Sequence, residues 1–278
     1  MSGKLLIVGD SFCTYYVEEN RMYRDAAKSK PYIFKIKPYK YWFQYFADDL
    51  NLEVLNLSRS GAGNQQIFEN AIYALNTNKD IKTLILGWSS FDRFDLPMTN
   101  RGHLTLKITD DLIGSKTSGS ESKHYSNKYV PLFREDELFP MERQIDRFLN
   151  YSVTLDSLCK SKDVELIQFF TVFPMERTLY LEKIGKENYY LKKYINNKLM
   201  NHINTDNFFG FPGEPKIGGT NMQDVMLKQK NYEDLLVNKE RYIYSNECNR
   251  VYNIDSHPNG EGNKLIYETL KNFRLDKY

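Results

Sequence analysis

Short apolar runs alternate with amphipathic helical stretches along this chain, and this alternation limits the possible folds more than any other feature. The first run, Lys4-Leu5-Leu6-Ile7-Val8, is almost wholly apolar, which is typical of a strand buried on both faces of a sheet. Further strands are predicted at 53–57, 83–87, 164–170 and 251–254, and helices at 39–50, 64–75, 141–160 and 259–273. This order predicts the α/β class, with a mostly parallel sheet covered by helices on both faces.

Two stretches interrupt the alternation, at residues 92–138 and 200–240. The first contains a segment rich in Ser, Lys and Gly, and a β-hairpin is predicted around residues 103–108. The second is rich in Gly, Pro, Phe and Asn at 204–223, which predicts a long loop that is either functional or a surface excursion. Because no repeat or linker divides the chain, we expect one domain over residues 1–278, with these two stretches as insertions.

The composition argues against several other classes of protein. Hydrophobic residues make up 41% of the 278 residues, and the net charge of +2 gives no basis for nucleic-acid binding. No apolar run approaches the roughly 18 residues that span a membrane, and no signal segment is evident. We therefore expect a cytoplasmic protein without a membrane partner, and the oligomeric state stays open. The three cysteines form no CxxC pair and are expected to be free thiols, and the histidines at 103, 124 and 202 lack metal-ligand spacing.

Polar and glycine residues follow three of the predicted strands. Asp10 and Ser11 follow the first strand, residues 58–64 follow the second, and residues 88–90 follow the third. His257 precedes the last helix in an Asp-x-His-Pro turn. Because ligands bind beyond the carboxyl ends of strands in an open parallel sheet, we expect these segments to meet at one edge.

The residue types at this edge suit nucleophilic catalysis. Ser11 supplies a hydroxyl in a sharp turn, His257 a base, and Asp255 a carboxylate that orients the base. Gly61 or Gly63 can present a backbone N–H to an oxyanion, because no side chain intervenes.

Several neighbouring residues allow two interpretations. Cys13 is either a rival nucleophile or a small buried residue, and we favour burial. Asp10 is either a second acid or an acceptor of local backbone hydrogen bonds. Trp88 is either pocket wall or core, and the pocket wall is slightly favoured, as it is for Phe91. Arg93 is interpreted as part of an ion-paired helix start at residues 92–95, with contact to an anionic substrate as the alternative.

Three blocks of the chain resemble those of a known family, the SGNH/GDSL hydrolases. Gly9-Asp10-Ser11-Phe12 resembles the first block, and residues 56–61 resemble the second, whose glycine (here Gly61) donates to the oxyanion hole. Residues 255–259 resemble the last block, which carries the Asp and His of the triad. The resemblance spans residues 5–273 and implies a flavodoxin-like three-layer α/β/α sandwich. It also implies hydrolysis of esters, thioesters or acetylated sugars through an acyl-enzyme, without metal or cofactor, on a small-molecule or carbohydrate ester.

Two departures from the family pattern bear on activity. The third block of the family is Gly-x-Asn, but this chain has Gly87-Trp88-Ser89, so Ser89 or Asn64 would have to replace the oxyanion-hole amide. One residue separates Asp255 from His257, where the family usually has two.

A serine hydrolase is therefore the first functional hypothesis, with Asp10, Gly63 and Trp88 beside the substrate. The alternative is a catalytically weak or inactive binding or structural module of the same fold. Nucleotide or flavin binding is a weaker third hypothesis, because no GxGxxG or Walker pattern follows the first strand.

Overall fold

The structure is a computed structural model that describes residues 3–15, 39–98, 102–107, 141–175, 187–236 and 257–276. Within these residues, five strands form a parallel sheet in the order β2-β1-β3-β6-β7. The strands are β1 (Lys4–Gly9), β2 (Glu53–Asn56), β3 (Ile81–Trp88), β6 (Glu165–Phe170) and β7 (Phe208–Phe209). The predicted run at 251–254 lies outside the described residues.

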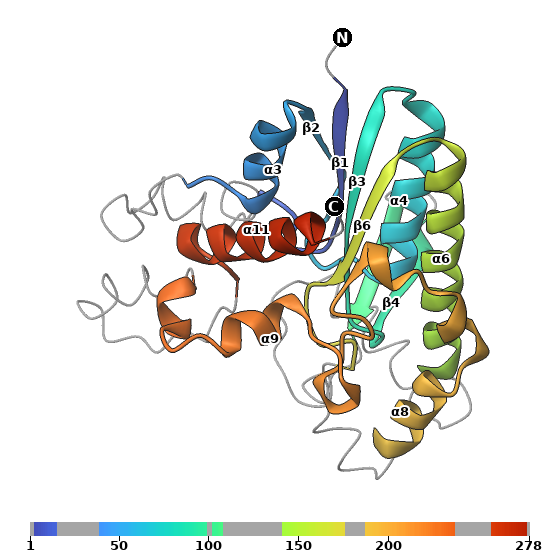
Figure 1. The fold of residues 1–278 in the computed structure, drawn as a ribbon. Coiled ribbons are helices and arrows are strands. Elements are labelled where there is room, and N and C mark those ends of the chain that lie inside the picture. Colours follow the sequence, from blue (N-terminus) through green and yellow to red (C-terminus); the bar gives the residue numbers. More distant parts are fainter. Residues whose placement is uncertain are drawn as a thin grey trace.

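Helices cover both faces of this sheet, which confirms the predicted α/β sandwich. One face carries α3 (Trp42–Leu50) and α11 (Gly260–Leu275), and the opposite face carries α4 (Asn64–Thr77) and α6 (Met141–Ser161) (Figure 1). The apolar stripe of each helix faces the sheet. In α3, for example, the side chains of Trp42, Phe43 and Phe46 are buried, and the helix ends at Asn51 in the left-handed conformation.

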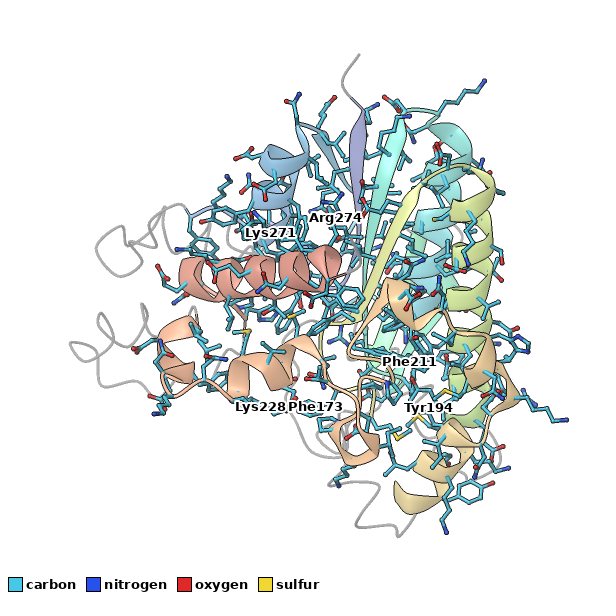
Figure 2. All side chains as sticks on the ribbon, in the orientation of Figure 1. Phe173, Tyr194, Phe211, Lys228, Lys271 and Arg274 are labelled. Atoms are coloured by element: carbon cyan, nitrogen blue, oxygen red, sulfur yellow. The ribbon has the colours of Figure 1, made fainter. Side chains whose placement is uncertain are left out.

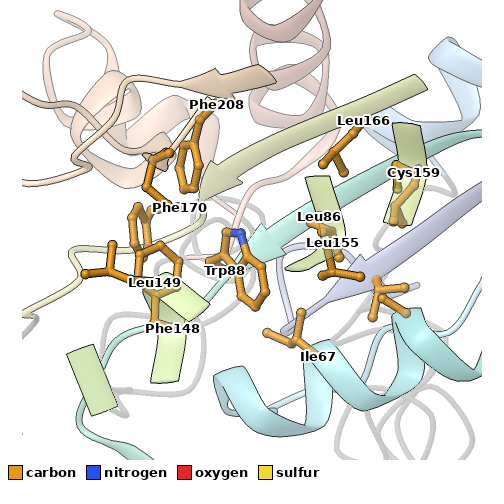
Figure 3. Packing of buried hydrophobic residues seen from close by; sticks show 14 of the residues in the cluster. Ile67, Leu86, Trp88, Phe148, Leu149, Leu155, Cys159, Leu166, Phe170 and Phe208 are labelled. Atoms are coloured by element: carbon orange, nitrogen blue, oxygen red, sulfur yellow. The ribbon is translucent and has the colours of Figure 1, made fainter. Parts of the chain in front are cut away.

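The strands supply alternate side chains to two hydrophobic clusters. Leu6 and Val8 of β1 point into the cluster under α4 and α6, whereas Leu5 and Ile7 point into the cluster under α3 and α11. Both faces of β1 are therefore buried, as its apolar sequence predicts. Figure 3 shows the first cluster, where aromatic rings from β3, α6, β6 and β7 pack together.

The two interrupting stretches contain more regular structure than the sequence indicated. The predicted hairpin is present as an antiparallel pair, β4 (Arg93–Met98) and β5 (Gly102–Lys107). The predicted loop at 204–223 is only partly irregular, because Phe208 and Phe209 form β7 and extend the sheet beside β6. It also contains η3 (Thr205–Asn207), η4 (Pro215–Ile217) and the start of α9 (Met222–Leu227), and η5 (Tyr232–Leu235) follows.

The helix α8 (Glu187–Ile195) and the following η2 (Lys198–His202) lie near the carboxyl ends of the strands. Tyr194 of α8 is fully buried, and its hydroxyl donates to the Pro212 carbonyl at 3.0 Å. Figure 2 shows Tyr194 beside Phe211, and their ring centroids are 6.4 Å apart. Burial raises the pKa of the Tyr194 hydroxyl well above its usual range, so the hydroxyl stays neutral and can donate. Its hydrogen bond joins α8 to the segment that contains Pro212.

Candidate active site

The turn after β1 is built around a buried thiol. Gly9 of β1 and Gly87 of β3 are paired in the sheet, and a side chain on either would collide with Cys13 Sγ. The Cys13 N–H donates to the Asp10 carbonyl at 3.0 Å, which closes the turn and places Ser11 at its tip. The two glycines thus let the chain fold back tightly at the carboxyl edge of the sheet.

Asp10 is fully buried and joins four segments beneath this turn. Its Oδ1 accepts the Phe12 N–H at 3.0 Å. Its Oδ2 accepts the hydroxyls of Ser89 at 3.2 Å and Thr171 at 2.8 Å, and it pairs with Arg93 Nη1 at 3.2 Å. Asp10 is therefore a structural anchor and not the substrate-binding residue predicted from sequence, because both of its carboxylate oxygens are bonded to protein groups and none of its surface is exposed.

The chain around His257 is held by several polar contacts. Pro258 forms an antiparallel bridge with Leu236, and the Tyr39 hydroxyl donates to the Pro258 carbonyl at 3.2 Å. Asn259 caps α11, as predicted, by accepting two N–H groups of its first turn at 3.0 and 3.1 Å. The Asn259 amide also donates to the Leu236 carbonyl at 3.2 Å. These contacts fix the start of α11 and so the residue just before it.

Ser11 and His257 meet at this edge of the sheet. His257 Nε2 lies 2.6 Å from Ser11 Oγ, although the two residues are 246 positions apart in the chain. The His257 ring also packs against the Phe12 ring, with centroids 5.4 Å apart. Asp255, the predicted third member of the triad, lies outside the described residues.

The loop after β2 lies beside the turn that carries Ser11. The Arg59 N–H donates to the Gly9 carbonyl at 3.0 Å, which ties the loop to the end of β1. Gly61 is exposed and has φ +79°, a conformation that favours glycine. Within the described residues, no hydrogen bond takes up the Gly61 N–H. The Gly63 N–H, by contrast, donates to Asp95 Oδ1 at 3.0 Å, so it faces Asp95 instead of a substrate.

Two alternate residues of β4 support this loop from the hairpin. Arg93 Nη1 donates to the Ala62 carbonyl at 3.3 Å as well as to Asp10. Asp95 accepts the N–H of Gln66 at 2.9 Å and thereby caps the first turn of α4. The predicted helix start at residues 92–95 is therefore wrong, since this segment enters β4, but the expected ion pairing of Arg93 is present.

Ser89 stands where the SGNH/GDSL pattern has an asparagine, and its hydroxyl is already bonded within the protein. The Ser89 hydroxyl donates to Asp10, so it is turned into the protein. The Asn64 side chain is paired with the Ser89 backbone, with Oδ1 accepting its N–H at 2.8 Å and Nδ2 donating to its carbonyl at 3.0 Å. Because a primary amide carries two N–H groups, one Asn64 N–H is left for another acceptor.

Trp88 and Phe91 belong to the core and do not form a pocket wall. Both side chains are fully buried, and the Trp88 indole N–H donates to Gln168 Oε1 at 2.9 Å. The Trp88 ring packs edge-on against Phe148 of α6, with centroids 5.3 Å apart (Figure 3). The slight preference for a pocket wall was wrong because β3 extends through Trp88, which directs its side chain to the α6 face.

Cys13 is buried, as expected, and is unsuited to act as a nucleophile. Burial raises the pKa of the Cys13 thiol well above its usual range, and the negative charge of Asp10 adds to this effect. Burial also raises the pKa of Cys159 to about 12. Both thiols are free in the structure.

Sequence reasoning missed three residues that organise the site: Thr171, Trp42 and Asn263. Trp42 and Asn263 lie on the apolar faces of predicted helices. A buried asparagine at a position otherwise suited to an apolar residue is a signal that could have identified Asn263.

No metal cluster and no membrane span occur in the part of the chain that the structure describes. The His, Cys, Asp and Glu side chains of these residues form no group of three that could ligate a metal ion. None of the described helices combines the length and apolar character needed to cross a bilayer.

In fold, the chain resembles solved structures of the SGNH/GDSL hydrolases. The chain is similar to a lipolytic protein of the G-D-S-L family from Desulfitobacterium hafniense, with 12% identity, a TM-score of 0.41, and 98% of this chain and 99% of that chain covered. It is also similar to the psychrotrophic esterase EstA from Pseudoalteromonas sp., with 12% identity, a TM-score of 0.40, and 99% and 98% covered. No sequence-family model and no curated protein match the chain. The roles of individual residues therefore rest on the geometry of this chain.

Proposed function

We propose that the chain is a serine hydrolase that cleaves a small-molecule or carbohydrate ester through an acyl-enzyme on Ser11. The observation that carries this proposal is the 2.6 Å separation of Ser11 Oγ and His257 Nε2, which is hydrogen-bonding distance. The three sequence blocks and the position of the pair at the carboxyl edge of the sheet add support.

The pair would act in two half-reactions. In the first, neutral His257 accepts the Ser11 proton at Nε2 while Ser11 Oγ attacks the ester carbonyl carbon. The bond to the alcohol then breaks, and the alcohol leaves with the proton from the imidazolium. In the second, water gives a proton to His257 and attacks the acyl carbon, and Ser11 recovers that proton as the acid departs. Asp255 is proposed to orient the imidazole ring.

The oxyanion would be bound chiefly by backbone groups. We assign the N–H groups of Ser11 and Gly61 to it, with the second N–H of Asn64 as a third donor. Ser89 is not assigned as an oxyanion donor, because its hydroxyl donates to Asp10. Loss of one such donor typically lowers kcat by about 10²- to 10³-fold, so Asn64→Leu tests the third assignment.

The proposal is tested by a fluorophosphonate probe and by turnover of p-nitrophenyl acetate. We expect the wild-type chain to be labelled, Ser11→Ala to lose labelling and turnover, and His257→Ala to lose roughly 10²- to 10⁴-fold in rate. Ser60→Ala, an exposed serine on the neighbouring loop, is the matched control and should react as the wild type does. Equal labelling of Ser11→Ala and wild type would overturn the assignment of the nucleophile.

A catalytically weak or inactive binding module is the second candidate. The observation that favours it is the commitment of the Ser89 hydroxyl to Asp10, which leaves the family's third oxyanion donor without a direct replacement at that position. This candidate predicts a folded wild-type chain that neither labels nor turns over the ester.

A further inference from the structure

Trp42 lies between the two segments that carry Ser11 and His257. It is the first residue of α3 and is fully buried. Its indole N–H donates to the Phe12 carbonyl at 2.8 Å, and its backbone N–H donates to Asn263 Oδ1 at 3.1 Å. One residue therefore bonds the nucleophile turn through its side chain and α11 through its backbone.

On the serine side, Trp42 completes the fixation of the peptide groups next to the nucleophile. Phe12 follows Ser11 directly, and Asp10 accepts its N–H while Trp42 donates to its carbonyl. Because both the N–H and the carbonyl of Phe12 are hydrogen-bonded, its backbone has little freedom to rotate. Its ring contacts the ring of His257, so a shift of Phe12 would move both members of the pair.

On the histidine side, Trp42 acts through Asn263. The Asn263 amide donates to the carbonyl of Pro258 at 3.2 Å and to that of Asn259 at 2.9 Å. These are the two residues that follow His257. The backbone N–H of Trp42 holds the other end of the same side chain, so the position of Asn263 depends on α3.

The Trp42 ring is itself held rigidly. It packs edge-on against Phe43, Phe46 and Phe169, with centroid distances of 5.4, 6.3 and 5.7 Å. Phe169 belongs to β6, an interior strand of the sheet, so the direction of the indole N–H is set by the core. A rigid donor is what a fixed distance between two separate segments requires.

We propose that Trp42 is a positioning residue that sets the separation of Ser11 Oγ and His257 Nε2. It acts through Phe12 and Asn263 and makes no contact with the substrate. This inference rests on the proposed hydrolase function. Because a misplacement of about 1 Å can cost roughly 10²-fold in rate, loss of the indole N–H should lower kcat more than it changes KM.

The test compares the only two tryptophans of the chain. Both are fully buried with a bonded indole N–H, but Trp88 lies on the α6 face and bonds Gln168. Trp42→Phe should lower the rate of fluorophosphonate labelling and kcat by about 10- to 100-fold, with KM within about twofold. Trp88→Phe should lower stability comparably and leave the labelling rate close to that of the wild type.

A second variant removes the hydrogen bond without a cavity. Benzothienylalanine at position 42 keeps the shape of the ring but replaces the N–H with sulfur, and it should show the same loss of kcat. Labelling at the wild-type rate in both position-42 variants would overturn the positioning role alone. Failure of the wild type to label would overturn the hydrolase proposal, and the positioning role with it.

Fluorescence gives a readout that a purely structural role would not produce. In the Trp88→Phe background Trp42 is the sole tryptophan, and its emission should change when Ser11 is phosphonylated, because the indole N–H is bonded to the residue next to Ser11. In the Trp42→Phe background the emission of Trp88 should stay constant. Constant emission of Trp42 during phosphonylation would count against the proposal.

Discussion

At the scale of single residues, the candidate site depends on a buried carboxylate that bonds only to protein groups. Asp10 satisfies one backbone N–H, two hydroxyls and a guanidinium, and none of its surface is exposed. The Arg93 side chain is only 11% exposed, so it depends on this carboxylate for its charge partner. Breaking such a pair leaves an uncompensated charge inside the protein.

Asp10→Ala should therefore lower the free energy of unfolding by about 3–5 kcal/mol, as expected when one partner of a buried pair is removed. Urea unfolding followed by circular dichroism measures the change. Asp80→Ala, which removes the exposed partner of Lys4, is the control and should change stability little. Equal stability of Asp10→Ala and wild type would show that Asp10 is not an anchor.

The buried thiols predict a loss of stability at alkaline pH. Burial raises the pKa of Cys13 and Cys159 above the ordinary value of 9.0. Their stabilising contribution is fully present below about pH 9 and is lost as the pH rises towards the folded values, because the unfolded chain releases these protons first. In a Cys248→Ser background, urea unfolding should show this decline. Replacing both thiols with alanine should reduce its slope, and an unchanged slope would contradict the assignment.

At the same scale, the sequence predicted that Ser11 and His257 come together, as they do at 2.6 Å, but it did not predict which residues hold them there. The motif blocks predict these two positions because few residue types can act as a nucleophile or as its base. The bonds from Trp42 to Phe12 and Asn263 depend on how α3 and α11 pack, over separations of 30 and 221 residues. No local pattern encodes such a contact, so it could not be predicted.

At the scale of elements, the strand β4 links the β4–β5 hairpin to the candidate site. Its alternate residues Arg93 and Asp95 bond the loop at 58–63 and the first turn of α4. Gly63 has to be glycine here, because a side chain would collide with the Asp95 carboxylate. The hairpin thus fixes the loop that carries Gly61.

Asp95→Ala should lower the free energy of unfolding by about 1–2 kcal/mol through loss of the α4 cap. It should also slow fluorophosphonate labelling by roughly 10-fold, because the Gly61 loop loses its support. The control is Asn197→Ala, which removes the cap of η2 (the Leu199 N–H bond of 3.0 Å) together with the Asn197 amide bond to Asp146 of 2.6 Å, and it should leave labelling unchanged. If Asp95→Ala lost stability but was labelled at the wild-type rate, β4 would support the fold and have no effect on the reactivity of Ser11.

Most of the sheet and its covering helices followed from the sequence, including the four-residue strand β2, but β4 and β7 did not. The strands β1, β3 and β6 and the helices α4 and α6 have clear apolar patterns. These patterns indicate a strand or a helix whatever the element packs against. The strand β7 has two residues within a Gly- and Pro-rich stretch, too few to show a period. The local sequence at 92–95 favours the charged start of a helix. The segment from Arg93 onward is a strand because it pairs with β5.

At the scale of the whole molecule, the sheet joins two hydrophobic clusters into one cooperative structure. Successive residues of β1 and β3 belong to opposite clusters. Unfolding of these strands would therefore expose the side chains of both clusters at once. Trp42 lies in the cluster under α3 and α11, and Trp88 lies in the cluster under α4 and α6. The two tryptophans therefore report on the two faces separately.

Phe148→Ala tests this coupling. The Phe148 ring is fully buried on the Trp88 face, and its centroid lies 4.9 Å from that of the Phe170 ring. Phe148→Ala should therefore lower the free energy of unfolding by about 3–5 kcal/mol, and Phe148→Leu should lower it less. Because the strands are shared, the urea midpoint reported by Trp42 in a Trp88→Phe background should fall as far as the midpoint reported by circular dichroism. A Trp42 transition that stays in place while the circular dichroism transition shifts would mean that the two faces of the sheet unfold independently.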